Sequence, residues 1–299
     1  MRSLLALGLL LGCNSTSNPT MGAEPDAPAG TAVDAAMQSS TTVTLPEPTG
    51  TCPTIASGDV TFAPAGIPPR KVKLALPDAA HQGHGQLIIY WHATGSSPLE
   101  AAYSLGATEG AITAAGGIVA APYPDPTAGE FEWFIVNQSP KLDDFLVADE
   151  VVGCLNHAGL IDPAHIHSMG MSAGALQTTA VSFLRSAYIA SVATYSGGIP
   201  PGFSPAIENP ANKFAALIFD GGTTDDVFGV DFQAASMLYD TTLTGDGHFA
   251  AICDHGMGHA IPLDAAPSVA AFFTANGWGA WPSPYASGLP STFPSYCTL

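Results

Sequence analysis

Three residue types that together catalyse acyl transfer follow one another along the chain: a serine, an aspartate and a histidine. Ser172 lies in the sequence Gly170-Met171-Ser172-Ala173-Gly174, between a strand-like and a helix-like segment. A Gly-x-Ser-x-Gly sequence at such a sharp turn raises the serine hydroxyl above a sheet, where a base can reach it. Glycine and serine are common in this chain, so a serine in a plain glycine-rich loop is the alternative.

An aspartate-rich segment follows the apolar strand expected at residues 214–219. Asp225 is our candidate for the acid that would orient the histidine, and Asp226 is its main rival. Asp220 stands too close to the end of the strand. A solvated acidic loop or a calcium loop is the alternative, although the spacing of an EF-hand is absent.

Two histidines follow the last expected strand, residues 249–253. We prefer His259 as the general base because it lies further into the loop, just before the closing helix, whereas His255 would lie beside the site or on the surface. A serine hydroxyl is a weak nucleophile until a base accepts its proton, and the base needs an orienting acid. The order of serine, aspartate and histidine along the chain therefore predicts Ser172 as nucleophile, Asp225 as acid and His259 as base.

The oxyanion that forms during acyl transfer needs preorganised N–H donors. One is expected from the amide of Ala173, directly after the nucleophile, and the other from the loop at residues 92–97, for which a plain Gly/Ser turn is the alternative. Tyr123 and Trp133 are candidates for an aromatic wall that binds an acyl or aryl group. Packing in the core or within a loop is an equally good interpretation of both.

Apolar segments of strand length alternate with helical segments through the rest of the chain. This alternation predicts an α/β fold with a mostly parallel central sheet and helices on both faces. Ligands bind at the carboxyl ends of the strands in such sheets, so the candidate residues should share one rim. Strands are expected at 60–62, 72–76, 86–91, 117–121, 164–169, 189–195, 214–219 and 249–253, and helices at 98–115, 140–157, 173–184, 232–243 and 267–276.

Four segments resemble the α/β-hydrolase esterases that are grouped with polyhydroxybutyrate depolymerases and feruloyl or acetylxylan esterases. They are Tyr90-Trp91-His92 with Gly95, Gly170 to Gly174, Gly222 to Val227, and Gly258-His259. The similarity covers most of residues 52–284. It implies an α/β-hydrolase fold, the roles given above for Ser172, Asp225 and His259, and an oxyanion hole formed by the amides of Thr94 and Ala173.

The chain departs from that family at Ala93, where relatives usually have glycine. An alanine would be strained there if the position required a positive φ. A non-catalytic lipoprotein that binds glycan or polymer is therefore kept as an alternative, beside a serine peptidase on the same fold. The favoured function is a serine esterase that acts on feruloyl or acetyl esters of plant polysaccharide, or on polyhydroxyalkanoate-type esters.

Length and composition limit the number of domains and the kinds of ligand the protein could bind. The chain has 299 residues, 46% of them hydrophobic, which suffices for a single domain, expected at residues 51–299. Only seven Lys and Arg stand against 25 Asp and Glu, giving a net charge of −18. Nucleic-acid binding, which needs a basic surface, is disfavoured. We expect no cofactor, and no metal site because Cys-x-x-Cys spacing is absent.

The N-terminus has the pattern of an export signal. Residues 1–13 combine Arg2, a short apolar run and Leu10-Leu11-Gly12-Cys13, which resembles a lipoprotein signal with Cys13 as the lipidated residue. An ordinary signal peptide is the alternative. Residues 14–50 are rich in Ser, Thr, Pro and Ala and predict a flexible tether. The protein is expected to be exported, either secreted or held at the outer membrane or cell surface, with membrane contact only through the lipid anchor.

The four remaining cysteines are an even number, which in an exported protein predicts two disulfides. They are Cys52, Cys154, Cys253 and Cys297. Three pairings are possible and the sequence does not choose among them. We lean towards Cys253–Cys297, which would hold the tail beside the last strand, with Cys52–Cys154.

Overall fold

A computed structural model describes residues 42–78, 83–203 and 205–299 of the chain. The expected signal at residues 1–13, with Cys13, and residues 14–41 of the expected tether lie outside this part.

A nine-stranded sheet forms the centre of the described domain, in the order β1-β2-β4-β3-β5-β6-β7-β10-β11. The six strands from β4 to β10 in this order are parallel, whereas β1, β2 and β11 are antiparallel to their neighbours. A two-stranded hairpin, β8–β9, stands apart from the sheet. The strands are β1 (Gly58–Phe62), β2 (Arg70–Ala75), β3 (Gly85–Trp91), β4 (Ile118–Pro122), β5 (Ile161–Met171), β6 (Ser191–Tyr195), β7 (Ala215–Asp220), β8 (Asp226–Val227), β9 (Val230–Asp231), β10 (Phe249–Asp254) and β11 (Cys297–Thr298).

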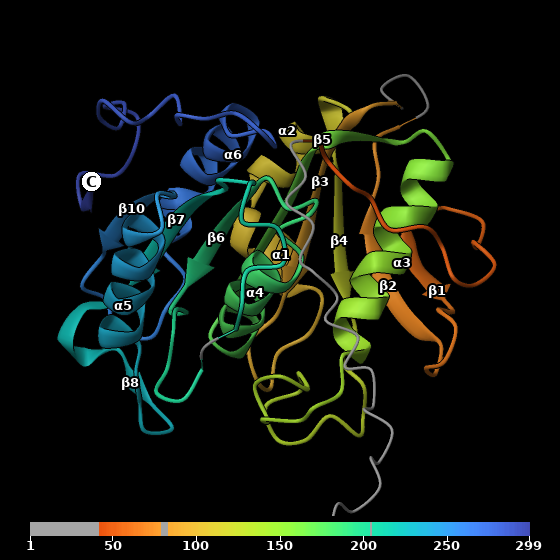
Figure 1. The fold of residues 1–299 in the computed structure, drawn as a ribbon, viewed down its shortest axis with the longest axis horizontal. Coiled ribbons are helices and arrows are strands. Elements are labelled where there is room, and N and C mark those ends of the chain that lie inside the picture. The colour runs from red at the N-terminus through yellow and green to blue at the C-terminus, as the bar shows by residue number, and fades with distance from the viewer. Residues whose placement is uncertain (1–41, 79–82, 204) are drawn as a thin grey trace, which may run out of the picture. The chain divides into compact units, whose positions relative to one another are not determined.

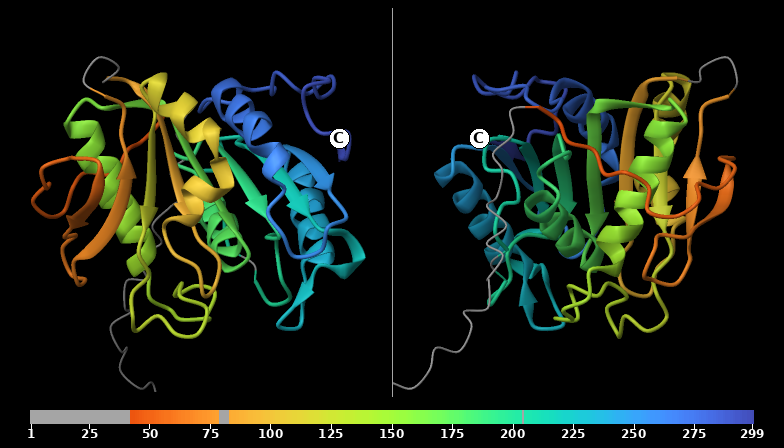
Figure 2. Two further views of the ribbon diagram at one scale, coloured as in Figure 1. Left: turned by 180° about the vertical axis from the view of Figure 1, so that it is seen from behind. Right: turned by 45° about the vertical axis from the view of Figure 1, so that its right-hand side comes forward.

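Helices cover both faces of this sheet. One face carries α3 (Asp143–His157), α4 (Ala173–Leu184) and α5 (Phe232–Gly245), in front in Figure 1. The other carries α1 (Glu100–Leu105), α2 (Ala107–Ala114) and α6 (Ala266–Ala275), seen from behind in Figure 2. Two apolar cores result, one on each side, and successive side chains of β3 enter them alternately. The predicted fold class is confirmed.

The helix expected at residues 98–115 is two helices. Gly106, with φ of 52°, separates α1 from α2. Glycine adopts this left-handed conformation at little cost, so the chain turns there instead of continuing the first helix. The prediction of one continuous helix was wrong at this point.

The last residues of the expected tether belong to the folded domain. The buried carboxylate of Glu150, in α3, accepts hydrogen bonds from the backbone N–H groups of Thr49 and Gly50 at 2.7 and 2.9 Å. Val43 and Leu45 pack against the core on the same side of the sheet. A buried carboxylate needs such donors, which the sequence pattern of this segment does not reveal. The boundary predicted at residue 51 was therefore too late, and residues 42–50 are not a free tether.

Both disulfides join the cysteines in the favoured pairing. Cys52–Cys154 ties the N-terminal segment to α3, and Cys253–Cys297 joins β10 to β11. That pairing is confirmed.

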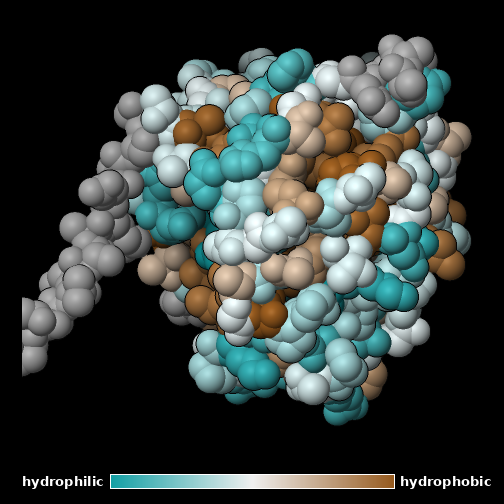
Figure 3. All heavy atoms as spheres, turned by 90° about the vertical axis from the view of Figure 1, so that its right-hand side faces the viewer, coloured by the Kyte–Doolittle hydropathy of each residue, from teal (hydrophilic) through white to brown (hydrophobic). Residues whose placement is uncertain are grey.

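No helix within the described ranges is long and apolar enough to cross a membrane. Figure 3 shows the β1 edge of the domain, where hydrophilic side chains interrupt the hydrophobic areas.

Candidate active site

The loops that carry the candidate residues lie at one edge of the sheet. Because β3, β4, β5, β6, β7 and β10 are parallel, their carboxyl ends point the same way, towards the lower edge in Figure 1. Ser172 directly follows β5, Asp225 follows β7 and His259 follows β10. The alternation of strands and helices therefore places all three residues on one rim.

Ser172 occupies a strained turn between β5 and α4. Its φ is 55° and its ψ is −120°, a conformation that few non-glycine residues adopt. The backbone N–H of Ser172 donates to the carbonyl of Tyr195, the last residue of β6, at 2.9 Å. This bond, and the start of α4 at the next residue, hold the turn in place. Only 8% of Ser172 is exposed.

The glycines on either side of Ser172 permit close packing of three backbones. A Cβ on Gly170 would lie 2.5 Å from the carbonyl oxygens of both Gly174 and Trp91. A Cβ on Gly174 would overlap the carbonyl of Trp91 and lie 2.7 Å from that of His92. The two glycines therefore let the end of β3 pass directly against the turn, which brings the loop at residues 92–97 beside Ser172.

We predict that Gly174→Ala lowers the free energy of unfolding by about 3 kcal/mol or more, because the added methyl group overlaps backbone atoms that must then shift. Denaturant unfolding measures this. Gly110→Ala, in α2 with no atom within 4 Å of the added Cβ, is the matched control, expected to be neutral or stabilising by up to about 1 kcal/mol. Equal effects of the two substitutions would contradict this account.

The structure brings Ser172, His259 and Asp225 into one hydrogen-bonded series. Nε2 of His259 lies 2.8 Å from Oγ of Ser172, and Nδ1 lies 2.7 Å from Oδ1 of Asp225. The ring of Phe232 packs on the imidazole with 4.8 Å between ring centroids. The rivals lie elsewhere. Asp226 is exposed in β8, and Nδ1 of His255 accepts a hydrogen bond from the N–H of Met257.

Asp225 is buried and its second carboxylate oxygen is also satisfied. Oδ2 accepts hydrogen bonds from Oγ of Ser196 at 2.7 Å and from the N–H of Gly221 at 2.9 Å. Burial is the largest influence on the pKa of Asp225 and raises it. The hydrogen bonds from His259, Ser196 and Gly221 together outweigh burial and lower the pKa below its usual value. Asp225 is therefore charged at neutral pH.

Sequence reasoning missed Ser196. It stands directly after β6, in a Ser-Gly-Gly sequence at the same rim, and this position was the available signal. The contact between Gly221 and Gly258 was also missed. The N–H of Gly258 donates to the carbonyl of Gly221 at 3.0 Å, and a Cβ on Gly221 would overlap Gly258. This close approach joins the loop that carries Asp225 to the loop that carries His259.

The loop after β3 is braced by carboxylates and by an indole. Oε1 of Glu100 accepts from the N–H of Ala93 at 3.0 Å, and Nε1 of Trp133 donates to the carbonyl of His92 at 3.0 Å. Ala93 does not have a positive φ, whereas Gly95 does, at 75°. The strain expected at Ala93 is therefore absent, because the left-handed residue of this loop is Gly95.

The backbone N–H groups of Thr94 and Ala173 are both free in the described structure. Within the described part of the chain, no hydrogen bond engages the backbone N–H of either residue. The buried hydroxyl of Thr94 likewise has no partner there. Ala173 is the first residue of α4, where helical N–H groups lack partners and the helix dipole favours negative charge.

The sequence matches no protein-family model, and no curated protein matches it significantly. Solved structures do match. The structure of native pOPH aligns with a TM-score of 0.65 at 15% identity, over 83% of this chain and 96% of that one. The Pyrobaculum calidifontis esterase aligns with a TM-score of 0.52 at 14% identity, over 72% and 83%. The chain has the α/β-hydrolase fold. The acylaminoacyl peptidase of Pyrococcus horikoshii also matches, with a TM-score of 0.55 at 12% identity, over 79% of this chain but 43% of that one.

The two aromatic candidates for a substrate-binding wall do not form one. Trp133 is fully buried, its ring makes an edge contact with that of Trp91, and its indole N–H donates to the carbonyl of His92. The hydroxyl of Tyr123 donates to Asp59 in β1, four strands away from β5 in the sheet. Burial keeps the ring of Trp133 from contact with a substrate, and the phenol of Tyr123 is held at the β1 side of the sheet.

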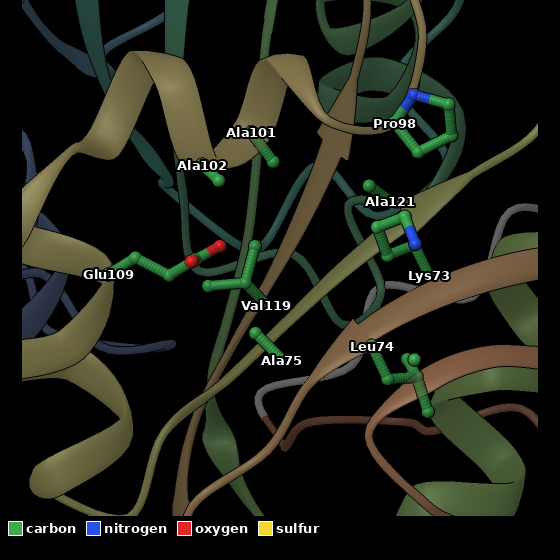
Figure 4. A pocket seen from close by; sticks show the side chains of 10 residues that line it. Lys73, Leu74, Ala75, Pro98, Ala101, Ala102, Glu109, Val119 and Ala121 are labelled. Atoms are coloured by element: carbon green, nitrogen blue, oxygen red, sulfur yellow. The ribbon is translucent and has the colours of Figure 1, made fainter.

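A cavity of about 160 Å³ lies away from the α/β-hydrolase rim. It is bounded by β2, β4 and the α1–α2 pair, and Glu109 and Val119 are among its lining residues (Figure 4). None of the three hydrogen-bonded residues of the site contributes to it.

Within residues 42–78, 83–203 and 205–299, no group of three or more His, Cys, Asp or Glu side chains could hold a metal ion.

The raised pKa of Asp220 predicts that the thermal stability of the protein depends on pH. Its buried carboxyl accepts from the N–H of Gly222, and burial, with the nearby charges of Asp254 and Asp225, raises its pKa to about 6. Because this pKa is higher than that of an unfolded aspartate, ionisation of Asp220 destabilises the folded state when the pH is above about 6. This destabilisation disappears as the pH falls towards the pKa of the unfolded chain.

Asp220→Asn retains the acceptor oxygen. We expect it to raise Tm by about 2 °C or more at pH 8, with the gain vanishing near pH 4. Thermal unfolding at the two pH values measures this, and Asp226→Asn, at an exposed carboxyl, should change Tm little at either. A gain for Asp220→Asn that is equal at both pH values would contradict the prediction.

Proposed function

We propose that the protein is a serine esterase that hydrolyses carboxylic esters through an acyl intermediate on Ser172. The observation that carries this proposal is the unbroken hydrogen-bonded series from Asp225 through His259 to Ser172. Ser172 stands on the strained turn between β5 and α4, and the carboxylate of Asp225 is buried. The catalytic roles are those proposed from the sequence.

The reaction follows from the geometry. Nδ1–H of His259 donates to charged Asp225, which leaves Nε2 unprotonated and facing Oγ of Ser172. As Oγ attacks the ester carbonyl, Nε2 takes its proton and then gives it to the departing alcohol. A water molecule attacks the acyl-serine in the same way, with His259 again as base, and releases the acid. Asp225 keeps the imidazole in the required tautomer and stabilises its charged form.

The amides of Thr94 and Ala173 would stabilise the oxyanion. Both N–H groups lack partners in the described structure, and the backbone around Trp91 packs against Gly174, which supports their placement on either side of Ser172. Ala93 is compatible with this role because its φ is ordinary. This ordinary backbone at Ala93 supports the esterase over the alternative of a non-catalytic binding protein.

We also propose export of the protein, with Cys13 as a lipidated N-terminus or with an ordinary cleaved signal. The two disulfides support this, since disulfides persist in oxidising compartments. The substrates proposed are feruloyl or acetyl esters of plant polysaccharide, or polyhydroxyalkanoate-type esters. The similarity to esterases in fold is compatible with all of them.

A chromogenic ester series from acetyl to long acyl groups, with a feruloyl ester, tests the proposal. Activity of the soluble domain on any of these esters, together with covalent labelling of Ser172 by a fluorophosphonate, would support it. A peptide panel run in parallel separates an esterase from a peptidase. Hydrolysis of peptides alone, or absence of both turnover and labelling, would overturn the esterase proposal.

A further inference from the structure

Two phenylalanines from separate loops meet at the rim that carries Ser172. Phe131 belongs to the loop between β4 and α3, and Phe228 stands at the tip of the β8–β9 hairpin. Their ring centroids lie 5.6 Å apart, with an angle of 71° between the ring planes, which is a favourable edge-to-face contact. Both segments lie beyond the carboxyl ends of the strands, at the lower edge in Figure 1.

Phe131 is attached to the oxyanion side of the site. The two residues that follow it both bond to the loop after β3. Oε2 of Glu132 accepts from the N–H of Gly95 at 3.2 Å, and Nε1 of Trp133 donates to the carbonyl of His92. The N–H of Phe131 itself donates to Oδ1 of Asn137, so its loop is held at several points.

Phe228 is attached to the opposite side, that of the acid and the base. Its hairpin begins at the residue after Asp225, and the N–H of Phe232, just beyond the hairpin, donates to the carbonyl of Asp225 at 2.9 Å. The ring of Phe232 packs on His259. The short β8–β9 hairpin therefore links Phe228 to Asp225 and, through Phe232, to His259.

The contact between the two rings crosses the ends of β5 and β6. These strands lie between β3 and β7 in the sheet, so the distance between the two anchoring loops is about 14 Å, three strand spacings. Ser172 directly follows β5, one of the two strands between these loops. Its exposure of only 8% is consistent with cover from above.

The backbone at Phe228 indicates that this ring is not there for stability. Phe228 and Gly229 have φ values of 55° and 74° and form the two-residue turn between the paired residues Val227 and Val230. Asparagine or glycine is preferred at the first position of such a turn, and a phenylalanine there is strained. The ring is also 68% exposed, so it contributes little to the core. Strain of this kind persists mainly where it serves a site.

We propose that Phe131 and Phe228 form an aromatic bar across the mouth of the site and that this bar selects esters near the end of a chain or in small molecules. An ester in the interior of a polymer extends in both directions from its carbonyl and would have to pass beneath the closed bar. This inference rests on the proposed function and adds the substrate class: short esters and the ends of oligomers.

The test uses fluorophosphonates, which react with Ser172 whatever the natural ester. A one-armed probe, with a single long chain on phosphorus, mimics a terminal ester, and a two-armed probe, with long chains on both sides, mimics an interior ester. We expect the wild-type protein to react at least about tenfold faster with the one-armed probe. Phe228→Asn should reduce this ratio about tenfold by accelerating the two-armed reaction. Phe131→Leu, which removes the ring from the other side, should act in the same direction.

Three further readouts separate this role from others. Phe228→Asn suits the positive φ, so Tm should stay constant or rise by about 2 °C, whereas a structural role would lower it. Hydrolysis of a butyryl ester should stay within about threefold of wild type. Met237→Ala, at an exposed residue of α5, is the control and should leave the probe ratio unchanged.

The outcomes distinguish the two proposals. Labelling of Ser172 with the same probe ratio in the wild type, Phe228→Asn and Phe131→Leu would overturn the aromatic bar and leave the esterase proposal standing. A lower Tm in Phe228→Asn without a change in ratio would assign the ring to structure. Failure of both probes to label the wild type would overturn the proposed function, and the bar with it.

Discussion

Ser172→Ala is expected to lower kcat for ester hydrolysis by about 10⁴- to 10⁶-fold, because the acyl intermediate cannot form without the hydroxyl. The folded structure should be retained, since Ala can replace Ser172 without adding an atom to the tightly packed turn and its backbone bond to Tyr195 remains. Stopped-flow or steady-state assays with a chromogenic ester measure the loss. Mass spectrometry after fluorophosphonate treatment measures the covalent adduct, which should disappear.

The control for this experiment is Ser291→Ala, at an exposed serine of the C-terminal segment, which should retain activity and labelling. A Ser172→Ala protein with most of its activity would contradict the assignment of the nucleophile. Circular dichroism and Tm, unchanged to within about 2 °C, would show that any loss of activity is chemical and not a loss of fold.

Asp225→Asn is expected to lower kcat by about 10³- to 10⁴-fold with little change in packing. An asparagine amide facing Nδ1 favours the tautomer in which Nε2 of His259 carries the proton, and that nitrogen then cannot accept one from Ser172. In the wild type, Oδ2 of Asp225 accepts hydrogen bonds from Ser196 and from the N–H of Gly221. Only the amide oxygen of the asparagine can accept these two bonds, so they hold the amide nitrogen towards Nδ1 of His259.

The neighbouring Asp226→Asn is the matched control, because the two residues differ by one position and by burial. We expect its kcat to stay within about threefold of wild type, as for other surface substitutions. A greater loss in Asp226→Asn than in Asp225→Asn would overturn the assignment of the acid. The pair therefore tests directly the choice that the sequence alone left open.

The elements were largely predictable because their signals are local. Residues 86–91 form a buried strand within a parallel sheet, as a continuous apolar run indicates, and the helix after Ser172 ends at Leu184 as expected. The exceptions have physical causes. Gly106 divides one expected helix into two, and the carboxylate of Glu150, a hundred residues away, recruits Thr49 and Gly50 to the domain.

The aromatic residues show where prediction from sequence ends. Tyr123 and Trp133 were chosen for their type and for the loop that contains them, yet Trp133 is fully buried and Tyr123 bonds to Asp59 in β1. Phe131 and Phe228, about a hundred residues apart in the chain, contact each other instead. Whether an aromatic ring in a loop points inwards or across the rim depends on the partners of its neighbours, here the contacts of Glu132 and the turn at Gly229.

Sequence alone predicts the succession of strands and helices along the chain, the turn that holds Ser172 and the rim on which the candidates lie. These depend on apolar periodicity, on glycines and on the rule that parallel strands end at one edge. Contacts in the folded structure select Asp225 and His259, rather than Asp226 and His255, for the hydrogen-bonded series with Ser172. They also add Ser196, which donates to Asp225. Residues one to four positions apart face different directions, and the choice among them is made by contacts between remote backbones, such as that of Gly221 with Gly258.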